Sequence, residues 1–200
     1  MKNVVVALTG AGISKSAGIP TFQDIPGITD KLSVNYKKSN PKDFETVMNS
    51  LKANCSDKSP TPAHLELAKY KVPIITMNID GLHQAAGSEY VLEIHGNVNK
   101  DNVVLYGEQI HFAEESVKLL YKCGDFCRDN VIVGNFLIVG SSMQTQFANY
   151  LAGMAEYYAN LNVESINENA DIEVPKFLET IDLEMQEMFY KIVMNDVDGE

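Results

Sequence analysis

The sequence predicts an α/β fold, a parallel sheet of about six strands with helices packed on both faces. Short runs rich in Val and Ile alternate with longer stretches in which apolar residues recur at helical spacing. The first such run leads directly into a glycine-rich turn, a frequent ligand-binding arrangement in these folds. With 200 residues, 45% of them hydrophobic, we expect one domain, residues 1–200, built around one core.

The first strand is predicted at Val4–Leu8, five consecutive apolar residues of which three are β-branched. The small residues that follow, Gly10, Ala11 and Gly12, let the backbone turn sharply, and their N–H groups open a helix and attract phosphate. The spacing departs from the common dinucleotide-binding pattern, since Lys15 stands where a third glycine is expected. Many α/β proteins turn this way without a ligand, so the turn alone does not establish a nucleotide site.

The next region combines a predicted loop with a predicted helix. Residues Gln23–Lys38 contain Pro, Gly, Asp and Lys with few apolar side chains, which is typical of a mobile surface loop. Asn40 followed by Pro41 is a helix start, and apolar residues recur at helical spacing up to Leu51. Residues 23–60 are therefore expected to form a small loop and helical subdomain.

The later elements continue the alternation. Apolar runs predict further strands at residues 72–76, 90–94, 103–106, 135–139 and 162–166. Helical spacing predicts helices at residues 63–71, 146–158 and 112–122, the last of these ended by a glycine cap at Gly124. From Pro175 onward an amphipathic pattern predicts a C-terminal helix, residues 175–194, which could pack on the sheet or pair with a second copy.

Three stretches carry a more specific signal. They are GAGISKSAGIPTF at residues 10–22, MNIDGLHQAAG at 77–87 and EIHGN at 93–97. In this order and spacing they resemble the motifs of the sirtuins, the NAD-dependent protein deacylases. Weaker echoes extend the likeness over most of residues 3–175, at residues 103–108, 138–144 and 165–167. The resemblance implies a Rossmann-like sheet that binds NAD at the carboxyl ends of its strands.

Three polar residues that follow strands are the candidate catalytic residues. By the resemblance, Asn78 orients the ribose or a catalytic water, and Asp80, with the Ile79 backbone, binds the nicotinamide carboxamide. His95 would act as a general base on a ribose hydroxyl, a role that suits a side chain with an ordinary pKa near 6.5. His83 would support the site. Without the flanking motifs, Asn-Ile-Asp-Gly is also good turn sequence.

The predicted NAD contacts extend across both small-residue turns. Phe22 would shield the nicotinamide side from water, and Asn167 would contact the adenosine ribose. The full set implied by the resemblance comprises Gly10, Ala11, Gly12, Ile19, Pro20, Phe22, Gln23, Met77, Asn78, Ile79, Asp80, Gly140, Ser141, Ser142 and Asn167.

The chain departs from the sirtuin pattern in two ways. Sirtuins usually carry a zinc-bound small domain between the histidine motif and the next strand, but only residues 97–102 stand there, so most of the small domain and its peptide groove are expected to be reduced. Gln23 replaces a family arginine and Met77 a family glutamine, and each change removes a cofactor contact worth about 1–3 kcal/mol. No metal is expected, because Cys123 and Cys127 have only His111 as a further nearby ligand.

Charge and composition limit the partners. The formal net charge is −11, and residues 101–200 carry 18 acidic side chains against five basic ones. Such a surface repels nucleic acid and is compatible with a lysine-rich acylated protein or peptide as substrate. No apolar run is long enough to span a membrane, so we expect a cytoplasmic protein, as a monomer or a homodimer.

Three functions fit these observations. The first is an NAD-dependent protein lysine deacylase, which cleaves the bond between nicotinamide and ribose and transfers the acyl group to ADP-ribose. The second is NAD hydrolysis or ADP-ribosyl transfer, suggested by the reduced small domain. The third is a non-catalytic binder of NAD or ADP-ribose, suggested by Gln23 and Met77, although it leaves His95 without a role.

Overall fold

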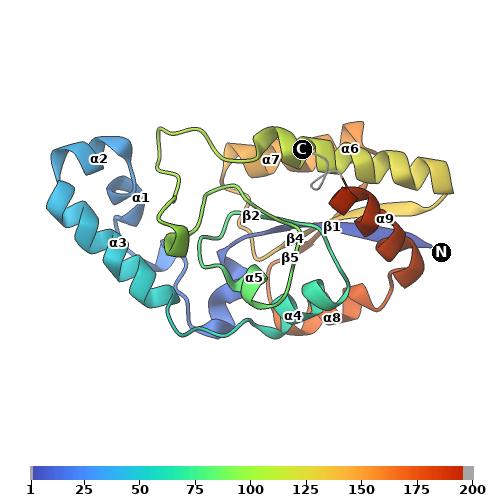
Figure 1. Cartoon of the computed structure of the whole chain (residues 1–200), viewed down its shortest axis with the longest axis horizontal. Helices are drawn as coiled ribbons and strands as arrows, with labels where there is room; N and C mark the ends of the chain where they lie inside the picture. The colour runs from blue at the N-terminus through green and yellow to red at the C-terminus, as the bar shows by residue number, and fades with distance from the viewer. Residues whose placement is uncertain (1, 196–200) are drawn as a thin grey trace.

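The computed structural model describes residues 2–195. Its centre is one parallel sheet of five strands in the order β3-β2-β1-β4-β5 (Figure 1), formed by β1 (Asn3–Thr9), β2 (Ile74–Thr76), β3 (Val91–Glu93), β4 (Val133–Val139) and β5 (Asn162–Ile166). The predicted α/β class is confirmed. The strand order reverses between β1 and β4, and ligands in such sheets bind beside this point at the carboxyl ends of the strands.

Helices cover both faces of the sheet (Figure 1). One face carries α6 (Ala113–Asn130), α7 (Gln146–Gly153), the π-helix η4 (Met154–Tyr158) and α9 (Leu183–Asn195). The other carries η1 (Ala11–Ala17), α4 (Pro62–Lys69) and α8 (Ala170–Leu178). The remaining helical segments are η2 (Phe22–Asp24), α1 (Ile28–Lys31), α2 (Val34–Ser39), α3 (Pro41–Cys55), α5 (Leu82–Ala85) and η3 (Val98–Lys100). No helix within residues 2–195 is long and apolar enough to cross a bilayer.

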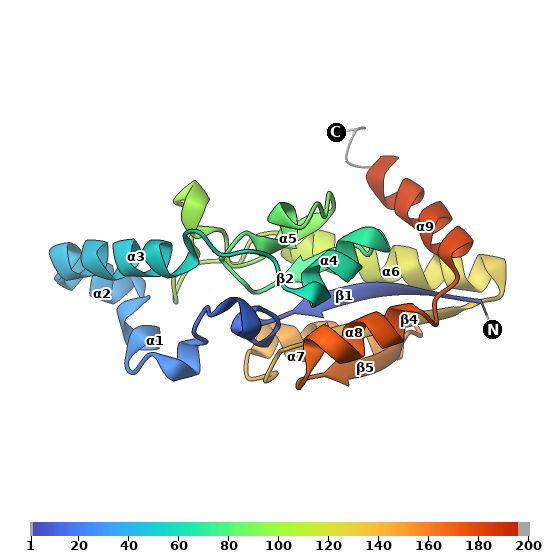
Figure 2. The same cartoon turned by 90° about the horizontal axis from the view of Figure 1, so that it is seen from below.

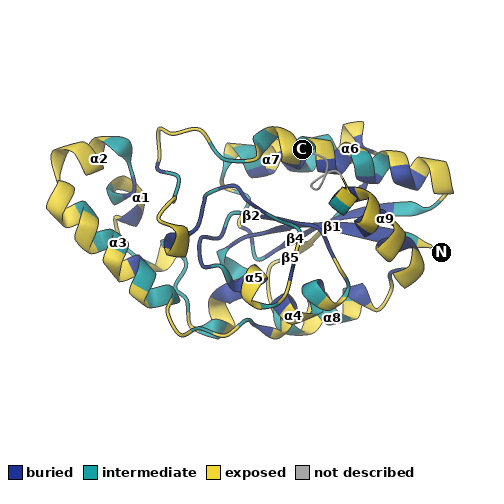
Figure 3. Cartoon of the chain, viewed as in Figure 1, coloured by how far each residue is buried: buried dark blue, intermediate teal, exposed yellow. Residues whose placement is uncertain are grey.

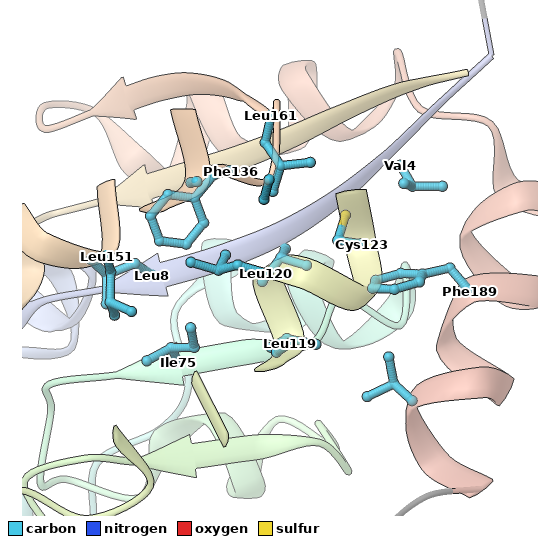
Figure 4. Packing of buried hydrophobic residues seen from close by; sticks show 14 of the residues in the cluster. Val4, Leu8, Ile75, Leu119, Leu120, Cys123, Phe136, Leu151, Leu161 and Phe189 are labelled. Atoms are coloured by element: carbon cyan, nitrogen blue, oxygen red, sulfur yellow. The ribbon is translucent and has the colours of Figure 1, made fainter. Parts of the chain in front are cut away.

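Alternate residues of the central strands feed two separate cores. Leu8 and Phe136 face α6 and pack with Leu120 (Figure 4), whereas Ala7 and Leu137 face α4 and α8. This period of two follows from the pleat of a strand. Because β1 and β4 are buried on both sides, their sequences read as continuous apolar runs (Figure 3).

A glutamine completes the hydrogen bonding of β1 where β2 is too short to reach. Gln186 of α9 accepts from the Val5 N–H at 2.8 Å and donates to the Val5 carbonyl at 3.1 Å and the Lys71 carbonyl at 3.3 Å. Its side chain is almost fully buried. The amide therefore replaces a neighbouring strand, which fixes α9 on the sheet.

Helices α1, α2 and α3 form a projection at one end of the molecule (Figure 2). The predicted loop at Gln23–Lys38 is wrong, because this stretch contains η2, α1 and α2. Its few apolar residues are enough to define a third core, in which Ile28 and Leu32 pack with Leu105 and with Leu51 of α3. The sequence pattern missed these helices because each has six residues or fewer, too short to show a period.

The predicted strand at residues 103–106 is also wrong, which leaves five strands. Tyr106 forms only an isolated parallel bridge with Ser33, donating to the Leu32 carbonyl at 2.8 Å and accepting from the Val34 N–H at 3.1 Å. The segment pairs with the start of α2 because the connection after β3 is short and leads toward the third core. Leu105 N–H is held by the Glu108 carboxylate at 2.8 Å.

Two predicted helix boundaries differ as well. Helix α6 continues through Gly124, where a Cβ atom would lie 2.3 Å from the Ala159 carbonyl oxygen, so the glycine permits close packing instead of capping the helix. The predicted helix at residues 175–194 is two helices, α8 and α9. The chain turns between them because the Asp182 N–H donates to the backbone and side-chain oxygens of Asn3 at 3.0 and 3.1 Å.

Candidate active site

The turns after β1 and β4 pack directly against each other at the point where the strand order reverses. Gly10 donates its N–H to the Val139 carbonyl at 2.9 Å, and Gly12 donates to the Gly140 carbonyl at 2.8 Å. A Cβ atom on Gly12 would lie 2.7 Å from the Gly140 Cα atom, so only glycine allows this approach. The Gly10 and Gly12 N–H groups are therefore bonded within the protein. The Ala11 N–H is the donor in this turn that has no hydrogen-bond partner among the described residues.

A buried polar cluster joins this turn to the end of β2. The Ser14 hydroxyl donates to Asp80 Oδ2 at 2.7 Å, and Asn78 Nδ2 donates to Ser14 Oγ at 3.3 Å and to the Gly10 carbonyl at 3.2 Å. Asp80 Oδ1 accepts from the Leu82 N–H at 2.9 Å. All three side chains are at least nine-tenths buried. Asn78 and Asp80 are thereby each held in one orientation by hydrogen bonds within the protein.

His95 lies beside this cluster at the end of β3. Its Nδ1 atom is 3.1 Å from the Met77 carbonyl oxygen. Because a carbonyl only accepts, Nδ1 carries the proton and Nε2 keeps a free lone pair. Burial lowers the pKa of His95 below its ordinary value of 6.5, and the hydrogen bond to Met77 partly opposes this. The ring is therefore a neutral base at pH 7, tied to the residue that precedes Asn78.

The residues predicted on the nicotinamide side differ in burial and in packing. Ile19, Pro20 and Phe22 are half-buried, and Phe22 packs against the third core. Gln23 is exposed. Met77 directs its sulfur toward the Thr145 hydroxyl, 3.6 Å away, and packs on the core under α7. The side chain that replaces the family glutamine is thus committed to the protein interior.

The second turn and the end of β5 extend the site toward the other end of the sheet. Ser141 is buried and accepts from the Met143 N–H at 3.1 Å, whereas Ser142 is exposed. A cavity of about 500 Å³ opens after β5, and Asn167, Lys176 and Phe177 contribute to its lining. The predicted contact Asn167 follows β5, whereas Asn78 follows β2, so the two glycine turns after β1 and β4 lie between them.

Sequence reasoning assigned no role to Ser14, although it lies within the first motif. Its position between Asn78 and Asp80 makes it the link of the buried cluster. A serine in a glycine-rich turn gives no signal of its own, because this residue type also favours turns for local reasons.

The structure contains no group that matches a metal site. Among residues 2–195, no three His, Cys, Asp or Glu side chains are arranged to hold a metal ion. Cys123 and Cys127 are buried in the core between α6 and the sheet. His111 stacks edge-on against Phe112.

Comparisons with known proteins agree with this geometry. The Sir2 family model matches residues 10–128. The NAD-dependent protein deacylase of Aggregatibacter actinomycetemcomitans is 32% identical over 202 residues, covering 84% of this chain and 96% of that protein. The NAD-dependent protein deacylase of Helicobacter pylori is 30% identical over 244 residues, covering 92% of this chain and 99% of that protein.

Solved structures give the same result. A Sir2 enzyme structure at 27% identity has a TM-score of 0.71 and covers 89% of this chain and 92% of that chain. A structure of Sir2 bound to acetylated peptide, at 22% identity, has a TM-score of 0.70 over 88% of this chain and 92% of that chain, a likeness of fold. The family model over residues 10–128 and the two relatives at 30–32% identity over most of the chain confirm the predicted family, and the chain belongs to the Sir2 family, the sirtuins.

Proposed function

We propose that this protein is an NAD-dependent protein lysine deacylase that breaks the nicotinamide–ribose bond and transfers the acyl group to ADP-ribose. The observation that carries the proposal is the neutral His95 ring, whose Nδ1 is bonded to the carbonyl of Met77, the residue before Asn78, and whose Nε2 therefore keeps a lone pair. Deacylase relatives at 30–32% identity support the same activity.

The shape and chemistry of the site fit a dinucleotide. Asp80 and Ile79 lie at one end, and the Ile79 N–H has no recorded acceptor among residues 2–195. The cavity beside Asn167 lies at the other end, and Ala11 offers a backbone donor between them. NAD would supply a positively charged nicotinamide as the leaving group and an anomeric carbon as the acceptor. No metal is then needed to assist departure of the leaving group.

Each polar side chain has a distinct task in this proposal. Asp80, held through both carboxylate oxygens, orients the carboxamide together with the Ile79 N–H. Asn78 donates through Nδ2 into the protein, so its Oδ1 atom is free to accept from a ribose hydroxyl or a water. His95 Nε2 takes the proton from a ribose hydroxyl. Phe22 excludes bulk water from the nicotinamide side.

A matched pair of histidine variants tests the proposal. Purified protein is incubated with NAD and an acetyl-lysine peptide, and released nicotinamide and deacetylated peptide are followed by mass spectrometry. His95→Ala should reduce peptide-dependent turnover at least about 100-fold, the lower end of a general base contribution. His111→Ala, the control, should keep the wild-type rate. Full turnover by His95→Ala would reject the role of His95.

The short connection after β3 favours a second candidate, NAD hydrolysis or ADP-ribosyl transfer. Only residues 97–102 stand where sirtuins carry the small domain, and the Leu105 N–H on the adjoining segment is already bonded to Glu108. A peptide that adds as a strand at this edge must first displace that carboxylate. Nicotinamide release without peptide would support the second candidate, and strict peptide dependence would exclude it.

A non-catalytic binder is the third candidate. Exposed Gln23 and the inward Met77 thioether favour it, since each lacks the polar group of the family residue. It predicts binding of NAD or ADP-ribose by calorimetry without any nicotinamide release under either condition.

A further inference from the structure

Asn78 is linked to a row of buried side chains, and the proposed reaction does not use these side chains. The Asn78 N–H donates to Thr76 Oγ1 at 3.0 Å, and Thr76 Oγ1 accepts from the Thr9 hydroxyl at 2.8 Å. Thr9 Oγ1 in turn lies 2.8 Å from Nε2 of His83. Thr9, Thr76 and His83 are each at least 98% buried. The backbone of Asn78 is thus connected to an imidazole on α5 through two hydroxyl groups.

A second buried imidazole lies next to the first. The ring centroids of His64, on α4, and His83 are 4.6 Å apart, with an interplanar angle of 57°. His64 Nε2 and His83 Nδ1 are both buried, and neither has a hydrogen-bond partner among residues 2–195. Buried polar atoms in folded proteins almost always have a partner, so two orphaned nitrogens on neighbouring rings point to a missing bridging group.

The hydrogen bonds on the opposite nitrogens fix what each orphaned atom offers. Two groups of Thr61 contact His64 Nδ1, the backbone N–H at 3.3 Å and the hydroxyl oxygen at 2.7 Å. An amide N–H can only donate, so Nδ1 accepts, the hydroxyl is placed as a second donor, and the His64 proton lies on Nε2. The Thr9 hydroxyl donates to Thr76, so Thr9 accepts from His83 Nε2–H. His83 Nδ1 then carries a free lone pair. One ring presents a donor and the other an acceptor.

We propose that His64 and His83 bind one buried water between them, and that the chain from His64 through the water, His83, Thr9 and Thr76 positions Asn78 for the reaction. A water accepts from His64 Nε2–H and donates to His83 Nδ1, which satisfies both nitrogens. The chain joins α4, α5, β1 and β2, so it fixes the loop after β2 against three other elements. His83 and His64 are positioning residues, since each acts on Asn78 through the hydroxyl groups of Thr9 and Thr76.

The water itself is tested without any activity measurement. Nitrogen-15 spectra of the full chain at pH 7 should show both rings in the Nε2–H form, with a cross-peak from the His64 Nε2 proton to a slowly exchanging water. A His83 ring protonated on Nδ1 would present two donors to each other and overturn the proposed chain. Absence of the water cross-peak would do the same.

The positioning role rests on the proposed function and is tested with variants that nearly keep shape. Thr76→Val removes the acceptor of the Asn78 N–H and should lower the kcat for nicotinamide release about tenfold, while the KM for NAD changes less than twofold. Thr76→Ser keeps the hydroxyl and should restore most of the rate. Thr9→Val breaks the links of Thr9 to both Thr76 and His83, keeps the bond from the Asn78 N–H to Thr76, and should lower kcat about threefold.

The outcomes distinguish the positioning role of the histidine pair from the proposed deacylase function. Equal kcat values in Thr9→Val and the wild type would show that the histidine pair does not reach Asn78, and would refute the positioning role. A merely structural role would lower the melting temperature of Thr76→Val without lowering kcat measured well below it. If the wild type releases no nicotinamide at all, the proposed function fails, while the ring spectra still decide whether the water is bound.

Discussion

The buried histidine pair makes the fold sensitive to acid. Burial lowers the pKa of His64 from 6.5 to about 4, against the opposing charges of Asp80 and Asp171. Burial also lowers the pKa of His83 well below 6.5, and the neighbouring His64 adds to this. In the unfolded chain both rings take up a proton near pH 6.5. The unfolded state therefore binds more protons than the native state in the range from about pH 6.5 to 4.

This difference in bound protons decreases the free energy of unfolding as the pH falls. A histidine whose pKa is lowered in the native state does not change the free energy of unfolding at pH values above its unfolded pKa. Below pH 6.5 the free energy of unfolding decreases as the pH falls. For His64 the loss is complete near pH 4, and the interval from 6.5 to about 4 corresponds to about 3 kcal/mol. His83 acts in the same direction. This is a substantial fraction of the about 5–15 kcal/mol that stabilises a typical domain.

Urea unfolding at pH 7.0, 6.0, 5.0 and 4.5 measures this loss. The wild type and His64→Gln carry the same 27 acidic side chains, so the comparison between them isolates the ring. His64→Gln should be less stable than the wild type at pH 7 and should lose less stability on acidification. His111→Gln, which changes a half-buried histidine outside the pair, should follow the wild type. Parallel pH profiles of wild type and His64→Gln would refute the reasoning.

Three further predictions concern stability. Gln186→Leu leaves the buried N–H and carbonyl of Val5 unpaired and should lower the free energy of unfolding by about 2–4 kcal/mol, measured by urea denaturation. Val131 has a φ of 54° and is 92% exposed, so Val131→Gly should raise the melting temperature, by a net stabilisation of about 0.5–1 kcal/mol. Gly124→Ala should cost about 1–2 kcal/mol despite the better helix propensity of alanine, because Ala159 blocks the methyl group, and an unchanged melting temperature would contradict this packing.

The strands that the sequence predicted correctly are those whose own residues determine their burial. Five apolar residues in Val4–Leu8 cannot be solvated on either face, so their place in the centre of a sheet is settled locally. The segment at residues 103–106 has a similar apolar and β-branched composition, but it pairs with Ser33 outside the sheet. Its environment depends on where α2 lies, and no local pattern contains that information.

In the candidate site, too, the sequence indicates some features and does not contain others. Asn78, Asp80 and His95 are indicated in the sequence by the motifs that resemble those of sirtuins, and their roles stay predictions. The partners that orient them could not be predicted. Ser14 is far from Asp80 in the sequence, and their contact follows from the packing of η1 beside the end of β2. The use of the Gly12 amide inside the fold was likewise invisible, because a glycine turn reads the same with or without a free donor.

The short connection after β3 helps to hold the loop that carries Asn78 and Asp80. Val98 is buried in the third core and donates its N–H to the Ile79 carbonyl at 2.9 Å, between Asn78 and Asp80. The same core contains Leu51 of α3. The projection formed by α1, α2 and α3 is therefore joined to the segment between Asn78 and Asp80 through Val98 and the third core. His95 depends on a different contact, the Met77 carbonyl, so the two sides of the proposed site are held by separate parts of the fold.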